Sequence, residues 1–223
     1  MQINNITDID QWLLLSMSGG KYPFFEGCIS VYAMPCVWIP MLLAVLYVLL
    51  KNNNLKEFIT ITSLLITTFA LTYTIAEFAM QPLFDNLSSL SSESTSVILK
   101  KETSLLINSA NAFAIALFLS MLIRHNALTL SLLIWAGIGC YTEYHTLACY
   151  PKYILSGAVI GIICGLLAYK LFKYILSKQR KSRRDWISNR FTKSGYEVPD
   201  VYFLLVVLYG TFAALPIISF IVI

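Results

Sequence analysis

The sequence is organised by six long apolar runs separated by short polar segments. A transmembrane helix needs about 20 mostly apolar residues, because the hydrocarbon core of a bilayer is roughly 30 Å thick. All six runs are near that length, so the pattern predicts an all-α integral membrane protein with six transmembrane helices. The expected spans lie near residues 28–50, 58–80, 105–123, 128–144, 153–176 and 201–223.

The segments between the runs are too short for a further domain, so residues 1–223 are expected to form a single membrane domain. Residues 1–27 are expected to be an amphipathic segment outside the membrane. No positively charged stretch precedes the apolar residues Trp12 to Leu15, and therefore this segment does not resemble a cleavable signal peptide. The Ser-rich stretch 88–96 is expected to be an exposed connection.

Composition agrees with a membrane location, since 57% of the residues are hydrophobic and only 13% are charged. In soluble domains about a quarter of the residues are charged. The five cysteines include no Cys-x-x-Cys pair, so neither a disulfide framework nor a zinc site is indicated. We expect no metal or other cofactor, and no nucleic-acid partner, because no fold that binds nucleic acid is indicated.

The distribution of Lys and Arg predicts the orientation, because basic residues favour the cytoplasmic side. Twelve of the sixteen lie near the ends of the first, third and fifth runs or in the connections that follow them. Residues 177–198 are therefore expected to form a basic cytoplasmic loop, with both chain ends on the opposite side. Its first basic residues also suit contact with anionic lipid head groups, at about 1 kcal/mol each, although a role in topology alone would explain them. They are Lys178, Arg180, Lys181, Arg183 and Arg184.

Two patterns within the apolar runs invite an interpretation. Gly157, Gly161 and Gly165 are spaced four residues apart and form a ridge that permits close helix packing. The ridge suits packing within the chain or a homodimer contact.

The second run is rich in Thr, whose hydroxyl can bond back to its own helix. Glu77 in the same run is costly in an apolar environment, and it indicates either a cavity or a helix end at the membrane interface.

The connection between the fourth and fifth runs carries a recognisable framework. Tyr150 and Pro151, followed by the three ridge glycines, resemble the third signature of the type 2 phosphatidic acid phosphatases, the PAP2 superfamily. The stretch Ala110-Asn111-Ala112-Phe113-Ala114 resembles the end of the second signature in the bacterial branch of that family. The resemblance covers nearly the whole chain in span order and loop size. It implies a PAP2-like helical bundle in the bacterial inner membrane, with both termini and the site on the periplasmic side.

The resemblance also implies a chemistry. These phosphatases use a His nucleophile, a second His supported by an Asp, and Lys and Arg side chains that hold the phosphate. Imidazole is a good nucleophile near pH 7, and the cationic clamp stabilises the phosphoryl group in transfer. In this chain other residues stand at all of these positions. In the first signature, Gln81 and Ser88 stand at the positions of the Lys and the Arg, and in the second signature Asn108 stands at the position of a His. In the third signature, Glu143 stands at the Arg, Cys149 at the His and Tyr153 at the Asp.

The two histidines of the chain, His125 and His145, are expected on opposite sides of the membrane, so a mechanism with two histidines is unavailable. A Cys149 thiolate activated by His145 is conceivable as a different nucleophile. Pro151 makes a regular helix through this pair doubtful. The sequence therefore disfavours enzymatic activity.

The leading hypothesis is a catalytically degenerate PAP2-like membrane protein that acts as a structural or lipid-binding subunit of a membrane complex. Its expected partners are membrane lipids and either another integral-membrane protein or a second copy of the chain. The alternative is a lipid or polyprenyl phosphate phosphatase of the PAP2 family. A second alternative, a small transporter or channel, rests on Glu77 and the Thr residues of the second run.

Overall fold

The computed structural model describes residues 23–88, 93–147, 151–179, 191–192 and 194–222. These residues form seven α-helices and one short 3-10 helix, and so the predicted all-helical fold is confirmed for this part of the chain. In chain order the helices are α2 (Pro23–Tyr32), η1 (Pro35–Trp38), α3 (Ile39–Asn52), α4 (Leu55–Ser88), α5 (Glu93–Ile123), α6 (Asn126–Leu147), α7 (Pro151–Gln179) and α8 (Val198–Val222).

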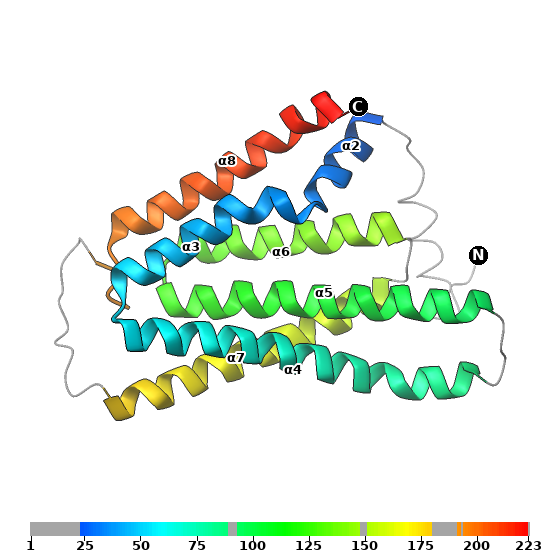
Figure 1. The fold of residues 1–223 in the computed structure, drawn as a ribbon, viewed down its shortest axis with the longest axis horizontal. Helices are drawn as coiled ribbons and strands as arrows, with labels where there is room; N and C mark the ends of the chain where they lie inside the picture. The colour runs from blue at the N-terminus through cyan, green and yellow to red at the C-terminus, as the bar shows by residue number, and fades with distance from the viewer. Residues whose placement is uncertain (1–22, 89–92, 148–150, 180–190, 193, 223) are drawn as a thin grey trace, which may run out of the picture.

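The long helices lie along a common direction, and successive helices from α3 to α8 run in opposite directions (Figure 1). α2 begins and α8 ends at the same end of this bundle, where α4 also ends and α5 begins. The opposite end carries the short connections from α3 to α4 and from α5 to α6.

Five helical segments of the described chain are long and apolar enough to cross a membrane. They are Pro35–Asn52, Leu55–Phe78, Thr103–Ile123, Lys152–Ile175 and Val198–Ile221. The remaining predicted span, near 128–144, corresponds to α6, which has 22 residues but is less apolar. The cause is its last two turns, which contain Thr142, Glu143 and His145. Because α6 contacts α2 and α5, this polar end lies against protein.

The first predicted span, 28–50, is not one continuous helix. α2 ends at Tyr32, and α3 starts only at Ile39. Pro35 explains the break, because proline lacks the N–H that continues a helix and disfavours helical backbone in the preceding residue. Met34 is accordingly extended, with φ −74° and ψ 121°. The indole Nε1 of Trp38 donates a 3.0 Å hydrogen bond to the carbonyl oxygen of Tyr32, which compensates for a helical partner lost at the break.

The predicted Ser-rich connection is shorter than expected. α4 continues through Gln81 and Pro82 to Ser88, and α5 begins at Glu93, so of residues 88–96 only 89–92 fall outside the described chain. Serine carries only a modest helix penalty, so the Ser residues on either side of 89–92 are compatible with the ends of the two helices. Residues 1–22 of the amphipathic segment and 180–190 of the basic loop also lie outside the described chain.

The glycine ridge lies where α7 packs against α5. A Cβ at Gly157 would come within 2.6 Å of the carbonyl oxygen of Leu106, and one at Gly161 would overlap the backbone of Ala110. Gly165 approaches α5 in the same way. The ridge is therefore occupied within the chain, and this packing leaves no room for the homodimer contact considered as its alternative role.

Most of the Thr residues of α4 bond back to their own helix, as predicted. Thr68 Oγ1 donates to the carbonyl oxygen of Leu64 at 2.6 Å, and Thr72 Oγ1 lies within hydrogen-bond distance of the carbonyl oxygen of Thr68 and of Asn111 Oδ1 on α5. Glu77 is exposed near the end of the apolar part of α4. This position agrees with a helix end at the interface rather than with a cavity.

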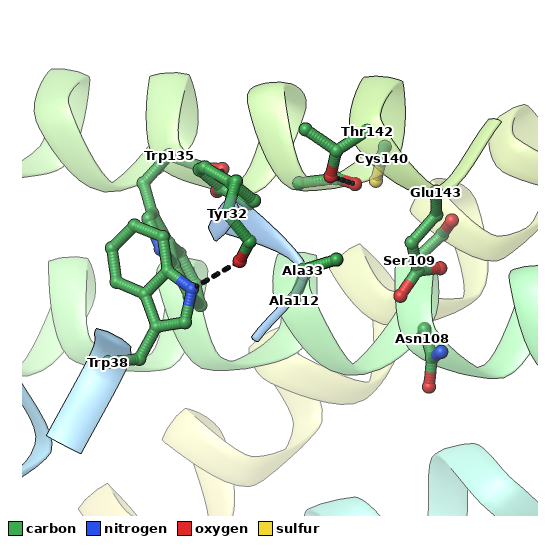
Figure 2. Close-up of a pocket in the computed structure, with 11 residues that line it drawn as sticks. Tyr32, Ala33, Trp38, Asn108, Ser109, Ala112, Trp135, Cys140, Thr142 and Glu143 are labelled. Atoms are coloured by element: carbon green, nitrogen blue, oxygen red, sulfur yellow. Dashed lines mark hydrogen bonds between the residues drawn. The ribbon is translucent and has the colours of Figure 1, made fainter. Parts of the chain in front are cut away.

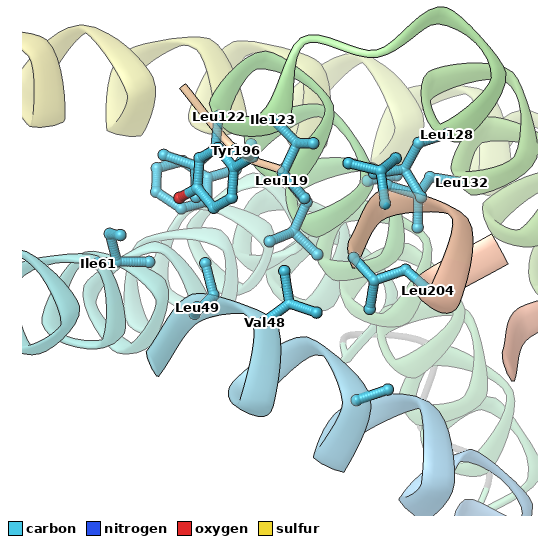
Figure 3. Close-up of a cluster of buried hydrophobic side chains, with 14 of the residues drawn as sticks. Val48, Leu49, Ile61, Leu119, Leu122, Ile123, Leu128, Leu132, Tyr196 and Leu204 are labelled. Carbon is cyan, nitrogen blue, oxygen red and sulfur yellow. The ribbon is translucent and has the colours of Figure 1, made fainter. Parts of the chain in front are cut away.

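The main hydrophobic core fills the end of the bundle where α3 meets α8, as Figure 3 shows. Tyr196, from the segment before α8, is buried in it and shares a 2.9 Å hydrogen bond with Asn53, whose Nδ2 donates. The Lys51 ammonium lies 2.7 Å from the carboxylate of Asp200 and 3.3 Å from that of Glu197. These polar contacts fix the start of α8 to the end of α3.

Candidate functional site

A cavity of about 210 Å³ lies between α2, α5 and α6, toward the end of the bundle where α6 ends (Figure 2). The lining residues are Tyr32, Ala33, Trp38, Asn108, Ser109, Ala112, Trp135, Gly139, Cys140, Thr142 and Glu143. Two of them, Asn108 and Glu143, stand where the family resemblance places catalytic residues. The structure therefore places these two positions, which are 35 residues apart in the sequence, around one cavity.

One wall of the cavity is aromatic, and the break after α2 positions it. The ring of Tyr32, the last residue of α2, lies 4.7 Å from that of Trp38 between centroids. Trp38 in turn lies 5.7 Å from Trp135 of α6. The Tyr32 hydroxyl donates a 2.8 Å hydrogen bond to the carbonyl oxygen of Trp135. This contact attaches α2 to the middle of α6.

The other wall is polar and comes from α5 and α6. In Figure 2 the Glu143 side chain extends from α6 toward Ser109 on α5. Thr142 is satisfied locally, because its hydroxyl donates to the carbonyl oxygen of Gly139 at 2.8 Å. In contrast, Ser109 Oγ, Trp135 Nε1 and Glu143 Oε2 are buried and have no hydrogen-bond partner among the described residues.

The charge of the lining is unlike that of a phosphate site. Glu143 is the one carboxylic acid among the lining residues, which include no Lys, Arg or His. A second anion in this cavity would meet a carboxylate with little water to screen the repulsion. The arrangement can accept hydrogen bonds and attract a cation, but it offers no cationic clamp.

The remaining predicted site positions do not reach this cavity or cannot be placed there. Tyr153 packs on α7 against residues of α4 and α5 in a separate buried cluster, with Lys152 Nζ 5.2 Å from its ring centroid. Gln81 and Ser88 belong to the last turns of α4, where side chains are not described. Cys149 lies outside the described residues, as do the basic residues 180–184.

The two histidines lie at opposite ends of α6. His125 immediately precedes the helix and packs against Tyr202 of α8, whereas His145 lies in the last turn beside Phe25 and Tyr141. Twenty helical residues at 1.5 Å each separate them by about 30 Å. Neither lines the cavity.

Sequence reasoning missed the aromatic wall. Tyr32, Trp38 and Trp135 belong to no motif, and the last is about a hundred residues from the others. The available signal was Pro35, which predicts an interruption in the first run and therefore an irregular segment that can turn side chains inward.

Comparison with known proteins agrees with a phosphatase-like bundle. The chain is 29% identical to the lipid A 4'-phosphatase of Bacteroides thetaiotaomicron over 184 aligned positions, which cover 75% of this chain and 78% of that protein. No protein-family model matches the chain, and no solved structure matches it significantly. The protein is thus a helical bundle of the membrane type that is similar, over most of its length, to a bacterial lipid phosphatase.

Proposed function

We propose that this chain is a bacterial inner-membrane protein that retains the bundle of a lipid phosphatase. It binds lipid at the end of the bundle where α6 ends, without hydrolysing phosphate. The observation that carries the proposal is the charge of the cavity. Glu143 stands where the resemblance expects a phosphate-binding Arg, and the lining contains no cationic side chain. Phosphoryl transfer depends on cationic groups that stabilise the developing charge. A carboxylate in their place opposes it.

The histidines support the same conclusion. The family mechanism needs a nucleophile and a proton donor on either side of one phosphorus atom, within hydrogen-bond reach of the reacting groups. His125 and His145 are about 30 Å apart along α6. They cannot act on one phosphate together.

A lipid phosphatase is the second candidate, and the similarity to a lipid A 4'-phosphatase over three quarters of each chain favours it. Such an activity would need a nucleophile other than a His of the family pattern. His145 and Cys149 are close in sequence, and a thiolate with an imidazole base is a known nucleophilic pair.

The two candidates are separated by measuring phosphate release and lipid retention on the same purified protein. The substrates are lipid A, phosphatidic acid and a polyprenyl pyrophosphate. We expect no phosphate above the protein-free control, together with lipid that stays with the protein through gentle purification. Release that His145→Ala or Cys149→Ala abolishes would establish the second candidate. Release that survives both substitutions would also overturn the proposal and require another mechanism.

The proposal includes a structural role beside another membrane protein. The outer faces of α3, α4 and α8 carry many exposed large apolar side chains, which suit contact with lipid or with a partner helix. Extraction in mild detergent should therefore yield the chain together with another integral-membrane protein. Purification as a monodisperse monomer, with no membrane complex depleted in a deletion strain, would remove the structural role and leave lipid binding alone.

A further inference from the structure

A groove runs along α4, which lies at one edge of the bundle (Figure 1). It has a volume of about 330 Å³ and is lined by Phe58, Ile59, Thr62, Ser63, Ile66 and Thr67. These residues form two rows whose members are four positions apart, and such rows are ridges on the surface of a helix. The short side chains of Thr62 and Ser63 stand in the middle of the two rows, and therefore the space between the ridges is hollow. We call this hollow the α4 groove.

The α4 groove faces away from the bundle at membrane depth. It lies within the apolar segment Leu55–Phe78, and the side chains of Ile59 and Ile66 are 62% and 64% exposed. Phe58 packs against the main hydrophobic core and so fixes the inner rim. The Thr67 hydroxyl donates to the carbonyl oxygen of Leu64 at 2.9 Å, which leaves its methyl group for contact. An acyl chain in this hollow gains dispersion contacts that an unfilled hollow loses.

A cationic side chain stands at one end of the α4 groove. Lys56 precedes the lining residues and is exposed, at the end of the bundle that the basic residues assign to the cytoplasm. Lys51 forms both ion pairs of the described residues, with Glu197 and Asp200, and Lys56 forms none in that part of the chain. A lysine near a membrane surface extends its ammonium toward the head groups. The cytoplasmic leaflet is anionic and attracts such residues.

We infer that the α4 groove binds an anionic phospholipid of the cytoplasmic leaflet, with an acyl chain between the two ridges and the phosphate beside Lys56. Charge complementarity favours this occupant over a transmembrane helix of a partner. A helix fills the groove but pairs with Lys56 only if it carries an acid at the matching level, whereas the phospholipid supplies chain and charge in one molecule. This site lies at the opposite end of the bundle from the lipid binding proposed above and does not depend on it.

The test maps lipid contacts on the full-length protein reconstituted in phosphatidylcholine vesicles. The probes are phosphatidylglycerol and phosphatidylcholine with the same photoactivatable acyl chain, and the crosslinked positions are read by mass spectrometry. The comparison surface is the exposed face of α3 at Leu43, Tyr47 and Leu50, which ends at the paired Lys51 in the same leaflet. At residues 58–67 we expect about fivefold more crosslinking from phosphatidylglycerol than from phosphatidylcholine, with no such preference on α3. Equal preferences on the two surfaces would overturn the inference.

Variants separate the charge from the shape. Lys56→Gln should abolish the preference for phosphatidylglycerol at residues 58–67, whereas Lys170→Gln, at another exposed lysine near the cytoplasmic end of α7, should leave it intact. Ser63→Phe fills the α4 groove and should reduce the crosslinking of both probes there, while Ser156→Phe on the exposed side of α7 should not. A preference that survives Lys56→Gln, or crosslinking unchanged by Ser63→Phe, would contradict the inference.

The remaining outcomes identify other occupants and keep this site apart from the proposed function. If a helix of a second copy fills the α4 groove, residues 58–67 are protected from both probes and Ser63→Cys forms a disulfide-linked dimer, which would refute the inference. Phosphate release from a lipid would overturn the proposed function but would not alter crosslinking at α4. If Ser63→Phe fails to fold, the comparison of α4 with α3 on the unmodified protein and the Lys56→Gln variant still decide the inference.

Discussion

Replacing Gly161 with alanine tests the packing of α7 on α5. Gly161 is buried, and a Cβ at this position would overlap the backbone of Ala110. A backbone cannot rotate away as a side chain can. At Gly157, one turn earlier, the corresponding contact with the carbonyl oxygen of Leu106 would be 2.6 Å, whereas real Cβ atoms essentially never approach closer than 3.0 Å. The added methyl group must therefore push the two helices apart.

The size of the effect follows from two opposing contributions. Overpacking a well-packed contact costs about 1–3 kcal/mol, and a backbone-to-backbone overlap favours the upper end of that range. Alanine is more favourable than glycine in a helix by about 1 kcal/mol, which offsets part of the cost. The expected net loss is about 2 kcal/mol. For a chain of this size, that loss lowers the Tm by about 4–8 °C.

Gly210→Ala in α8 is the matched control, since nothing lies within 4 Å of a Cβ built there. It retains the gain in helix propensity without the overlap and should leave the Tm unchanged or higher. The measurement is the loss of the monodisperse peak in size-exclusion chromatography after heating the purified proteins in detergent. If Gly161→Ala is as stable as Gly210→Ala, α5 and α7 are not packed as closely as described, and the argument fails.

Two further predictions concern the end of α3 and the orientation of the bundle. Asp200→Ala should lower the free energy of unfolding by about 1–3 kcal/mol, because this buried carboxylate accepts a hydrogen bond from Lys51. Glu197→Gln, at the more exposed carboxylate that Lys51 also contacts, should lower it by less than about 1 kcal/mol. Equal losses for the two variants would contradict this ranking. The Lys152→Cys variant should react with an impermeant thiol reagent in intact spheroplasts, whereas Asn54→Cys should react only after lysis. The protein without either substitution is the control for its native cysteines. The reverse pattern would invert the proposed orientation.

The apolar runs predicted most of the helical architecture, because the length needed to cross a bilayer is a strong constraint on sequence. The structure differs from the predicted spans in detail where local chemistry competes with that constraint. Pro35 breaks the first run into α2 and α3, and the polar residues at the end of α6 make it less apolar than a membrane span. α4 also extends to Ser88, beyond the apolar run, which hydropathy does not report.

The candidate site was predicted in part. Family resemblance drew attention to Asn108 and Glu143, which the cavity does bring together. It could not predict the aromatic wall, because Tyr32 and Trp135 meet only through tertiary packing over 103 positions of sequence. It also placed Tyr153 at the site, but this side chain belongs to a separate cluster. Sequence composition predicts that these residues lie within a membrane bundle. Tertiary packing decides which of their side chains line the same cavity.

The packing of α2 on α8 has a consequence for how the protein is made. α2 contacts chiefly α8 and α6; the ring of Tyr32 lies 6.3 Å from that of Phe212, and Ser219 Oγ donates to the carbonyl oxygen of Phe24 at 3.4 Å. Among the described helices, α2 is synthesised before all the others, yet its main neighbour is α8, which is synthesised after them. Until α8 is inserted, α2 has chiefly α6 to pack against, so the wall of the cavity to which Tyr32 belongs gains its full support only after α8 has been synthesised.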